Sequence, residues 1–215
     1  MELELNNAKL SDLHREVFAT DRDASQTALT MIAVSGRLTC FTGGTSVGRT
    51  RWLHALMGFE PLAEGFVCLD GEPLTPQSAP LFRRLMAYAP ARLEPVGLLH
   101  PVEPPTVEQV FHLLRNREQP ISNAILAEEV RRLQSGASIS ILPEGEVTEG
   151  RGGSDPRFQL IAVASLLGTP IVLVDDPPVT AVPYLSGLAS SGRMVILTSD
   201  EAAVHDASHL IVPIS

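Results

Sequence analysis

Apolar side chains follow two alternating patterns along the chain. Short apolar runs that favour strands occur at residues 2–5, 28–34, 37–42, 66–69, 171–174, 194–198 and 209–212. Apolar positions three and four residues apart predict helices over 106–115 and 123–133, and helices are also expected over about 50–57 and 156–167. Strands that alternate with helices are typical of an α/β layer fold with a largely parallel sheet. We therefore expect this fold class.

A proline-rich stretch at 95–105 interrupts the alternation in the middle of the chain. The two helices predicted after it indicate a small helical lobe. A chain of 215 residues suits one domain with such an inserted lobe better than two full domains. The predicted organisation is a core over about 1–92 and 156–215 with a helical lobe over about 93–155.

The charge balance limits the classes of partner. The chain carries 16 basic and 25 acidic residues, for a net charge of −9, which argues against a nucleic-acid partner because such partners are bound by a basic patch or stripe. Hydrophobic residues make up 44% and charged residues 19%, so we expect an ordered core. The first residues lack the pattern of a signal peptide, and the longest apolar stretch, 160–174, is shorter than a bilayer span of about 18 residues. These features predict a soluble protein.

Two cysteines and two histidines are residue types that commonly bind metals. Cys40 and Cys68 lack the number and spacing of a zinc site or a disulfide framework, so we expect buried free thiols. His205 and His209 form a His-x₃-His pair around Asp206, but no third ligand follows nearby in the sequence. The sequence therefore predicts no metal site at either place.

The segment GGTSVGRT at 43–50 fits the pattern Gly-x-x-x-x-Gly-Lys-Ser/Thr except at the lysine, where Arg49 stands. In this pattern, glycines allow backbone N–H groups to converge on phosphate oxygens, and the helix that follows adds positive potential. The Thr50 hydroxyl is a candidate magnesium ligand. The candidate nucleotide-binding residues are Gly43, Gly44, Thr45, Ser46, Val47, Gly48, Arg49, Thr50 and Arg51. An ordinary glycine turn between strand and helix is the alternative that this segment alone leaves open.

Further motifs follow the loop in order: Gly152-Gly153, and then the apolar run 171–174, which ends in Asp175 and Asp176. With these motifs in sequence, the chain resembles the ATPase subunit of ATP-binding cassette (ABC) transporters over nearly its whole length. Residues 51–74 resemble that family's helix and hairpin, 83–91 the approach to its glutamine loop, 150–177 its signature motif and Walker B strand, and 195–200 the strand before its switch histidine.

The resemblance implies a P-loop NTPase core with a mixed, largely parallel sheet, N-terminal antiparallel strands and a small helical lobe. It implies ATP and magnesium as ligands, with Thr50 and Asp175 at the magnesium and with Gly152 and Gly153 in the nucleotide-binding interface. It also implies two partners, an integral-membrane permease and a second ATPase subunit. The resemblance therefore predicts a cytoplasmic protein that is held peripherally on the inner face of the membrane by its permease.

Several positions depart from the family's pattern, and each has a role in turnover. Arg49 replaces a lysine, and its guanidinium is bulkier and planar, so we expect a weakened nucleotide affinity. Asp176 replaces the water-activating glutamate and is one methylene shorter; a displacement of about 1 Å can cost on the order of 10²-fold, which makes Asp176 a weak candidate base. Ser199 stands at the switch histidine and Ala91 at the glutamine. These departures predict a degenerate member, a pseudo-ATPase.

Three functions remain open from the sequence. The first is a non-hydrolysing or barely active structural or regulatory subunit that pairs with an intact ATPase subunit, because a homodimer would join two weakened loops to two weakened signatures. The second is a slow Mg-dependent ATPase that energises transport, with Asp176 as base and Arg49 on the phosphates. The third is an unrelated P-loop kinase or GTPase. A kinase would need an arginine-rich lid, and the Asn-Lys-x-Asp motif of a GTPase is absent because Lys9 is the only lysine.

Overall fold

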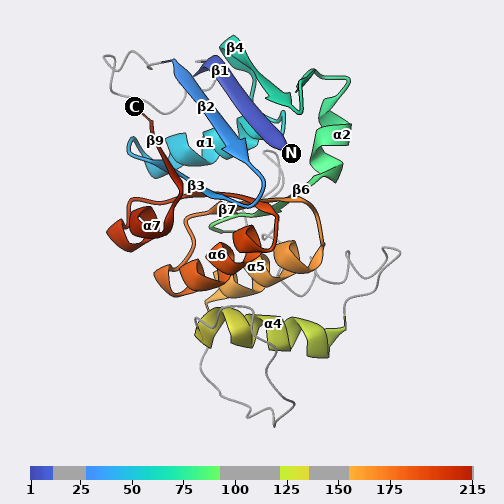
Figure 1. The fold of residues 1–215 in the computed structure, drawn as a ribbon, viewed down its shortest axis with the longest axis vertical. Coiled ribbons are helices and arrows are strands. Elements are labelled where there is room, and N and C mark those ends of the chain that lie inside the picture. Colours follow the sequence, from blue (N-terminus) through green and yellow to red (C-terminus); the bar gives the residue numbers. More distant parts are fainter. Residues whose placement is uncertain (12–27, 93–121, 136–154, 215) are drawn as a thin grey trace, which may run out of the picture.

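The computed structural model describes residues 1–11, 28–92, 122–135 and 155–214, and it confirms the α/β fold class (Figure 1). A four-stranded antiparallel sheet has the strand order β2-β1-β4-β5. Its strands are β1 (Glu2–Leu10), β2 (Leu29–Val34), β4 (Leu62–Leu69) and β5 (Glu72–Pro73). These are the antiparallel strands that we expect in the N-terminal part of the chain.

A second, five-stranded sheet is parallel throughout and has the strand order β6-β7-β8-β3-β9. Its strands are β3 (Leu38–Thr42), β6 (Met86–Ala89), β7 (Ile171–Asp175), β8 (Met194–Thr198) and β9 (Leu210–Pro213). Every residue of β7 and β8 is buried, as expected for inner strands covered on both faces. Because the strands are parallel, the segments that follow β3, β7 and β8 all lie at one edge of the sheet.

Helices cover both faces of the parallel sheet. The described helices are α1 (Ser46–Leu56), α2 (Ala79–Arg84), α4 (Asn123–Ser135), α5 (Pro156–Leu166), the 3-10 turn η2 (Val179–Ala181), α6 (Val182–Ser190) and α7 (Ala202–Ala207). Helix α1 lies between the two sheets, whereas α5 and α6 lie on the opposite face of the parallel sheet, with α4 beyond them (Figure 1). Trp52 of α1 stacks on Phe41 of β3, with 6.4 Å between the ring centroids. Among the helices that the structure describes, none is both long and apolar enough to cross a membrane.

Helix α4 is the described part of the predicted helical lobe, and it confirms the helix expected over 123–133. Its Leu133 is fully buried in the core that α5 and α6 form against the parallel sheet. Its Glu129 accepts a hydrogen bond from the Tyr184 hydroxyl of α6. The helix predicted over 106–115 lies outside the described residues, as does the remainder of the predicted lobe apart from Ser122 and Asp155.

Strand β1 extends to Leu10, whereas the predicted strand ends at Leu5. The strand passes through a bulge at Asn6 and Asn7, where the pairing with both neighbouring strands shifts and Asn7 has a φ of 46°. Beyond the bulge, the buried positions are Ala8 and Leu10, which no longer continue the alternation of the first half. The bulge therefore breaks the period of two on which strand prediction depends.

Helix α1 begins at Ser46 rather than near residue 50 as predicted. Thr45 caps the helix, because its side-chain oxygen accepts the Gly48 N–H at 3.0 Å. Apolar periodicity could not show this early start, since the first turn is solvent-facing and carries only exposed or half-buried residues before Arg49. The connection between β3 and α1 is therefore the short segment 43–45.

Five short elements, α2, β6, η2, α6 and α7, are not predicted from the sequence. Each has nine residues or fewer. Helix α6 carries Pro183 at its start and Gly187 in its interior, so its apolar pattern is short and interrupted. Tertiary packing between neighbouring elements stabilises segments whose local pattern is too short to predict.

The two cysteines are free thiols, but they differ in burial. Cys40 is buried in β3, and this burial raises its pKa to about 11. Cys68 in β4 is only partly buried, which corrects the expectation that both thiols are buried. The alternation of β4 is the reason: Val67 and Leu69 face the core, so the residue between them faces the other side of the sheet.

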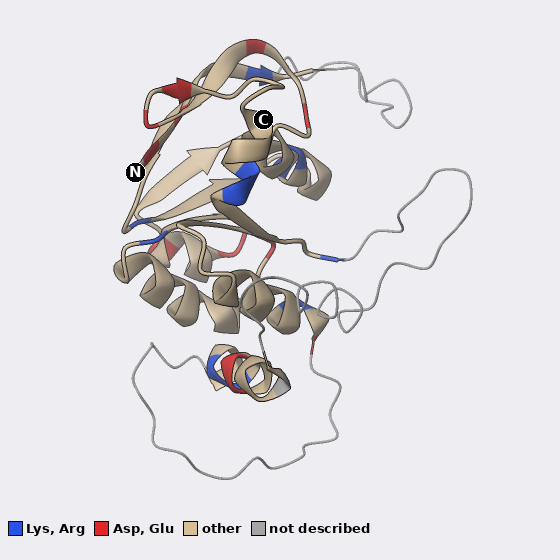
Figure 2. Cartoon of the chain, turned by 90° about the vertical axis from the view of Figure 1, so that its right-hand side faces the viewer, with Lys and Arg blue, Asp and Glu red and all other residues tan. Residues whose placement is uncertain are grey.

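Acidic and basic positions are interspersed in the described part of the chain, and both signs occur on the antiparallel sheet and on α4 (Figure 2). On α4, Glu128 pairs with Arg131 and Arg132, which lie three and four residues further along the helix. On the antiparallel sheet, Lys9 pairs with Glu64 at 2.9 Å. These pairs lie on exposed or half-exposed surfaces, where solvent screens the charges, so they contribute little to stability.

Candidate functional site

The predicted phosphate loop lies at the edge of the parallel sheet, between the end of β3 and the start of α1. Gly43 and Gly44 have φ values of 81° and 59°, a backbone conformation that glycine adopts without strain. The residues after them, Thr45 to Val47, are exposed, so the start of α1 faces solvent. A loop of this kind, with a helix N-terminus behind it, favours the binding of anions.

The two predicted magnesium ligands meet beside this loop. The Thr50 hydroxyl in α1 lies 2.6 Å from Oδ2 of Asp175 at the end of β7. Oδ1 of Asp175 accepts a hydrogen bond from the Thr198 hydroxyl at 2.6 Å, and that hydroxyl accepts the Asp176 N–H at 2.9 Å. A hydroxyl and a carboxylate are oxygen ligands of the kind that Mg²⁺ takes, alongside phosphate oxygens and water. The residues present therefore fit a magnesium ion and the phosphates that accompany it.

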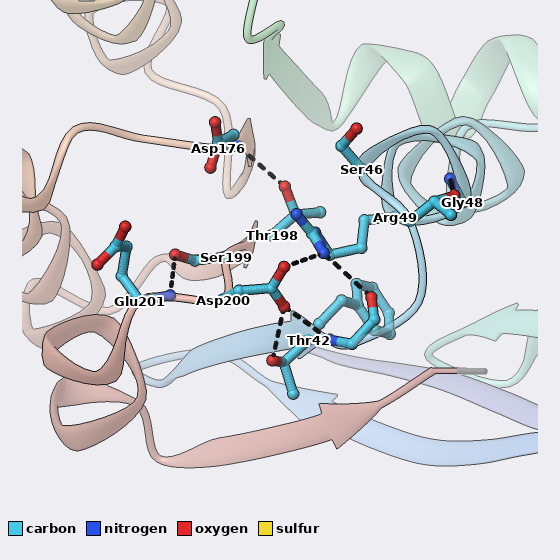
Figure 3. A network of polar contacts seen from close by, with 12 residues as sticks. Thr42, Ser46, Gly48, Arg49, Asp176, Thr198, Ser199, Asp200 and Glu201 are labelled. Atoms are coloured by element: carbon cyan, nitrogen blue, oxygen red, sulfur yellow. Dashed lines mark hydrogen bonds and ion pairs between the residues drawn. The ribbon is translucent and has the colours of Figure 1, made fainter.

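Arg49, which stands in the lysine position of the loop, is buried and turned back toward the base of the loop. Its Nη1 donates to the Gly43 carbonyl at 3.1 Å and forms an ion pair with the Asp200 carboxylate (Figure 3). Asp200 also accepts the Gly43 N–H at 2.9 Å and the Thr42 hydroxyl at 3.2 Å. The Gly43 N–H, together with the nearby Arg49 cation, lowers the pKa of Asp200 below its usual range.

Sequence reasoning did not single out Asp200. It directly follows the switch position, and that position comes at the end of β8, which pairs with β3 in the parallel sheet. Given this strand order, an acidic residue at the end of β8 lies close to the loop that follows β3. Two features of the sequence could have indicated Asp200: a cation in the loop, Arg49, without an acidic residue nearby in the loop, and an acidic residue directly after an adjacent strand.

The candidate base Asp176 follows β7 and has a φ of 46°, in the left-handed region. Arg157 in the first turn of α5 donates to the Asp176 carbonyl at 3.0 Å, and its Nη1 lies 3.7 Å from the Asp176 carboxylate. Arg157 also forms an ion pair with Asp155, the residue that caps α5. The side-chain hydrogen bond from Arg157 lowers the pKa of Asp155. Arg157, which ties the start of α5 to the end of β7, is a further residue that the sequence pattern did not indicate.

The Ser199 side chain, at the switch position, is fully buried. Its hydroxyl accepts the Glu201 N–H at 3.1 Å, at the start of α7, and its carbonyl lies 3.1 Å from Nε2 of His205. His209 accepts the Leu38 N–H at 3.2 Å, so this His-x₃-His pair is engaged with the backbone. Within residues 1–11, 28–92, 122–135 and 155–214, no group of three or more His, Cys, Asp or Glu side chains is placed to hold a metal ion.

Two further sets of candidate residues remain, Arg51 and the pair Gly152-Gly153. The Arg51 side chain donates from Nε to Glu60 at 2.9 Å and from Nη2 to the Ser11 carbonyl at 2.6 Å, so the group that it can offer to a phosphate is its backbone N–H. The signature-like segment, with Gly152 and Gly153, lies outside the described residues.

Comparison with known proteins gives a short match in sequence. No model of a known protein family matches the chain. The manganese transport system ATP-binding protein of Listeria innocua is 35% identical over 74 residues, which are 34% of this chain and 28% of that protein. The match therefore spans less than a third of the curated relative.

Solved structures match over the whole chain at lower sequence identity. An ATP binding subunit of an ABC transporter aligns with a TM-score of 0.63 and 15% identity, over 100% of this chain and 86% of that chain. A dimeric bacterial ABC transporter cassette aligns with a TM-score of 0.64 and 16% identity, over 99% of this chain and 94% of that chain. A bacterial Atm1-family ABC exporter with ATP bound aligns with a TM-score of 0.62 and 20% identity, over 37% of its length. The chain thus has the P-loop α/β fold of such cassettes.

Proposed function

We propose that this chain is an ATP-binding subunit of an ABC transporter and that it is a non-hydrolysing or barely active structural or regulatory subunit. The contact between the Thr50 hydroxyl and the Asp175 carboxylate, beside an exposed helix N-terminus, carries this proposal. The relatives named above are ATP-binding proteins of transporters, and the exporter structure holds ATP. The order of motifs in the sequence supports the same assignment.

In the proposed role, the backbone amides after Gly44, at the N-terminus of α1, bind the phosphates of ATP. Thr50 and Asp175 hold the magnesium ion, and Thr198 orients the Asp175 carboxylate through its hydrogen bond. Magnesium, when bound, neutralises charge on the phosphate oxygens and orients them. Arg49 supplies a positive charge at the base of the loop.

The arrangement around Asp176 supports weak or absent hydrolysis. A general base must reach the attacking water, and the aspartate side chain is one methylene shorter than the glutamate of the family pattern. Arg157 holds the Asp176 carbonyl at 3.0 Å and lies close to its carboxylate. The Ser199 hydroxyl is engaged with the start of α7, so it adds no group at the phosphates. Each of these features removes a contribution to turnover.

A slow Mg-dependent ATPase is the second candidate function. The Asp176 side chain is 50% exposed and directly follows the proposed magnesium ligand, so a water molecule can reach its carboxylate. A general base contributes roughly 10²–10⁴-fold to rate, and a misplaced one retains part of that contribution. Slow turnover is therefore compatible with the same nucleotide site.

Titration calorimetry with Mg-ATP tests nucleotide binding. We expect saturable micromolar binding by the wild type and a loss of about 10-fold in affinity in Arg49→Ala, because charge-assisted hydrogen bonds to the phosphates are lost. We expect Arg49→Lys, which restores a compact cation, to bind at least as tightly as the wild type. Arg84→Ala is the control for loss of positive charge, since Arg84 is exposed on α2. Absence of binding at millimolar ATP would contradict the proposal.

The proposal extends to the partners and the location of the chain. We infer that it pairs with an intact ATPase subunit on the cytoplasmic face of a membrane permease, with Gly152-Gly153 opposing the intact subunit's phosphate loop. A cassette of the same fold is dimeric, and the degenerate loop and signature favour an intact partner over a second copy. Affinity purification of the tagged chain from membranes is expected to recover a permease and an intact ATPase subunit in equal amounts. A homodimer without either partner would contradict this pairing.

A further inference from the structure

The cation of the phosphate loop has an anionic partner from within the chain. Arg49 pairs with the Asp200 carboxylate, and the same carboxylate accepts the Gly43 N–H at 2.9 Å (Figure 3). A phosphate in a loop of this kind is bound by the same two types of group, a cation and a backbone amide. Asp200 therefore already provides the anion for which the base of the loop is suited.

The two members of this ion pair differ in their freedom to move. The Arg49 side chain is 8% exposed, and its Nε has no hydrogen-bond partner among the described residues. The Asp200 side chain is 54% exposed, so it can turn into solvent. Because a buried guanidinium without a counter-charge is strongly destabilising, an anion that displaces Asp200 must take its place beside Arg49. This difference makes an exchange of anions at a fixed cation physically feasible.

The charge of Asp200 also acts on an approaching polyphosphate. The Gly43 N–H and the Arg49 cation lower the pKa of the Asp200 carboxyl, so the group is fully ionised at neutral pH. A unit negative charge at the base of the loop repels phosphate oxygens, and it neutralises the cation that would attract them. Both effects oppose phosphate binding for as long as Asp200 stays in place.

We propose that Asp200 is an internal competitor that sets the affinity of the phosphate loop, and that a polyphosphate binds by displacing it from Arg49. This inference rests on the proposed function, because it concerns the same loop. It assigns a determinant of affinity to a residue outside the loop motif, in the segment that directly follows β8, a neighbour of β3 in the sheet. Weak nucleotide binding then results from the Arg49–Asp200 pair as well as from the exchange of lysine for arginine.

Inorganic tripolyphosphate is the probe, and Asp200→Asn is the test variant. The asparagine oxygen still accepts the Gly43 N–H and the Thr42 hydroxyl, so the local fold is kept while the charge is removed. We expect Asp200→Asn to bind tripolyphosphate about 10-fold more tightly than the wild type in titration calorimetry. Its Tm without anion is expected to fall, and its gain in Tm with anion to exceed that of the wild type.

Two further variants define the source of the effect. Asp70 matches Asp200 in exposure, at 54% of the side chain, and it also accepts a backbone N–H, from Glu2 at 2.6 Å. Asp70→Asn therefore removes the same charge far from the loop and is expected to leave tripolyphosphate affinity unchanged. In an Arg49→Ala background, Asp200→Asn is expected to lose most of its gain, because the competition is for Arg49.

The results separate this inference from the proposed function. An unchanged or weaker tripolyphosphate affinity in Asp200→Asn overturns the inference, and an equal gain in Asp70→Asn does so as well. If the wild type binds Mg-ATP but Asp200→Asn does not increase the affinity for tripolyphosphate, the proposed function is supported and the role of Asp200 as a competitor is overturned. If Asp200→Asn increases the affinity for tripolyphosphate but neither protein binds Mg-ATP, the role of Asp200 as a competitor is supported and ATP is contradicted as the ligand.

Discussion

The Asp175→Asn variant is expected to bind ATP on the order of 100-fold more weakly than the wild type in the presence of magnesium, because loss of even an outer partner of a metal ligand costs about 10–100-fold in metal affinity. Asp175 lies 2.6 Å from the Thr50 hydroxyl and is held by Thr198, so its carboxylate is preorganised for the ion. An asparagine keeps the shape but lacks the negative charge that Mg²⁺ prefers. Titration calorimetry with ATP in the presence of magnesium, and again in EDTA, measures this loss.

The same variant distinguishes the two candidate functions. A slow ATPase shows Mg-dependent phosphate release in the wild type and none in Asp175→Asn, whereas a non-hydrolysing subunit binds Mg-ATP without release above background. Asp70→Asn serves as the control, because it removes one carboxylate from an exposed turn away from the loop. Equal magnesium dependence of ATP binding in the wild type and Asp175→Asn would contradict the assigned metal ligand.

The Gly65→Ala variant is expected to be destabilised by about 3 kcal/mol or more, from overpacking together with backbone strain. Gly65 lies in β4 opposite the bulge of β1, with a φ of 73°. A Cβ at this position would overlap the carbonyl oxygens of Asn6 and Asn7. Because the overlapping atoms belong to the backbone, a rotamer change cannot relieve the clash.

Urea unfolding of Gly65→Ala beside Gly71→Ala measures this effect. Gly71 has a similar φ of 84°, but an added Cβ there meets no atom of the described chain within 4 Å. The second variant therefore reports backbone strain alone, which costs about 1 kcal/mol. The difference between the two free energies of unfolding gives the contribution of the close approach. Equal losses would show that β1 and β4 can separate at the bulge.

Much of the parallel sheet could be predicted because its inner strands are continuous apolar runs. The runs 171–174 and 194–198 correspond closely to β7 and β8. The end of β1 could not be predicted, since the bulge at Asn6 and Asn7 changes which side chains face the core. The start of α1 was misplaced for a related reason: its exposed first turn is defined by a cap, and a cap leaves no apolar periodicity.

The candidate site likewise has a part that local sequence indicates and a part that depends on long-range contacts. The sequence by itself determined where the glycine loop between β3 and α1 lies, because the left-handed conformations of Gly43 and Gly44 are local properties of consecutive residues. Only the tertiary structure decided what surrounds the loop. The order of β7, β8 and β3 brings Asp175 to Thr50 and Asp200 to Arg49, across 125 and 151 residues of chain. Local pattern carries no information about such distant pairs, so the charge that balances Arg49 was found only in the folded sheet.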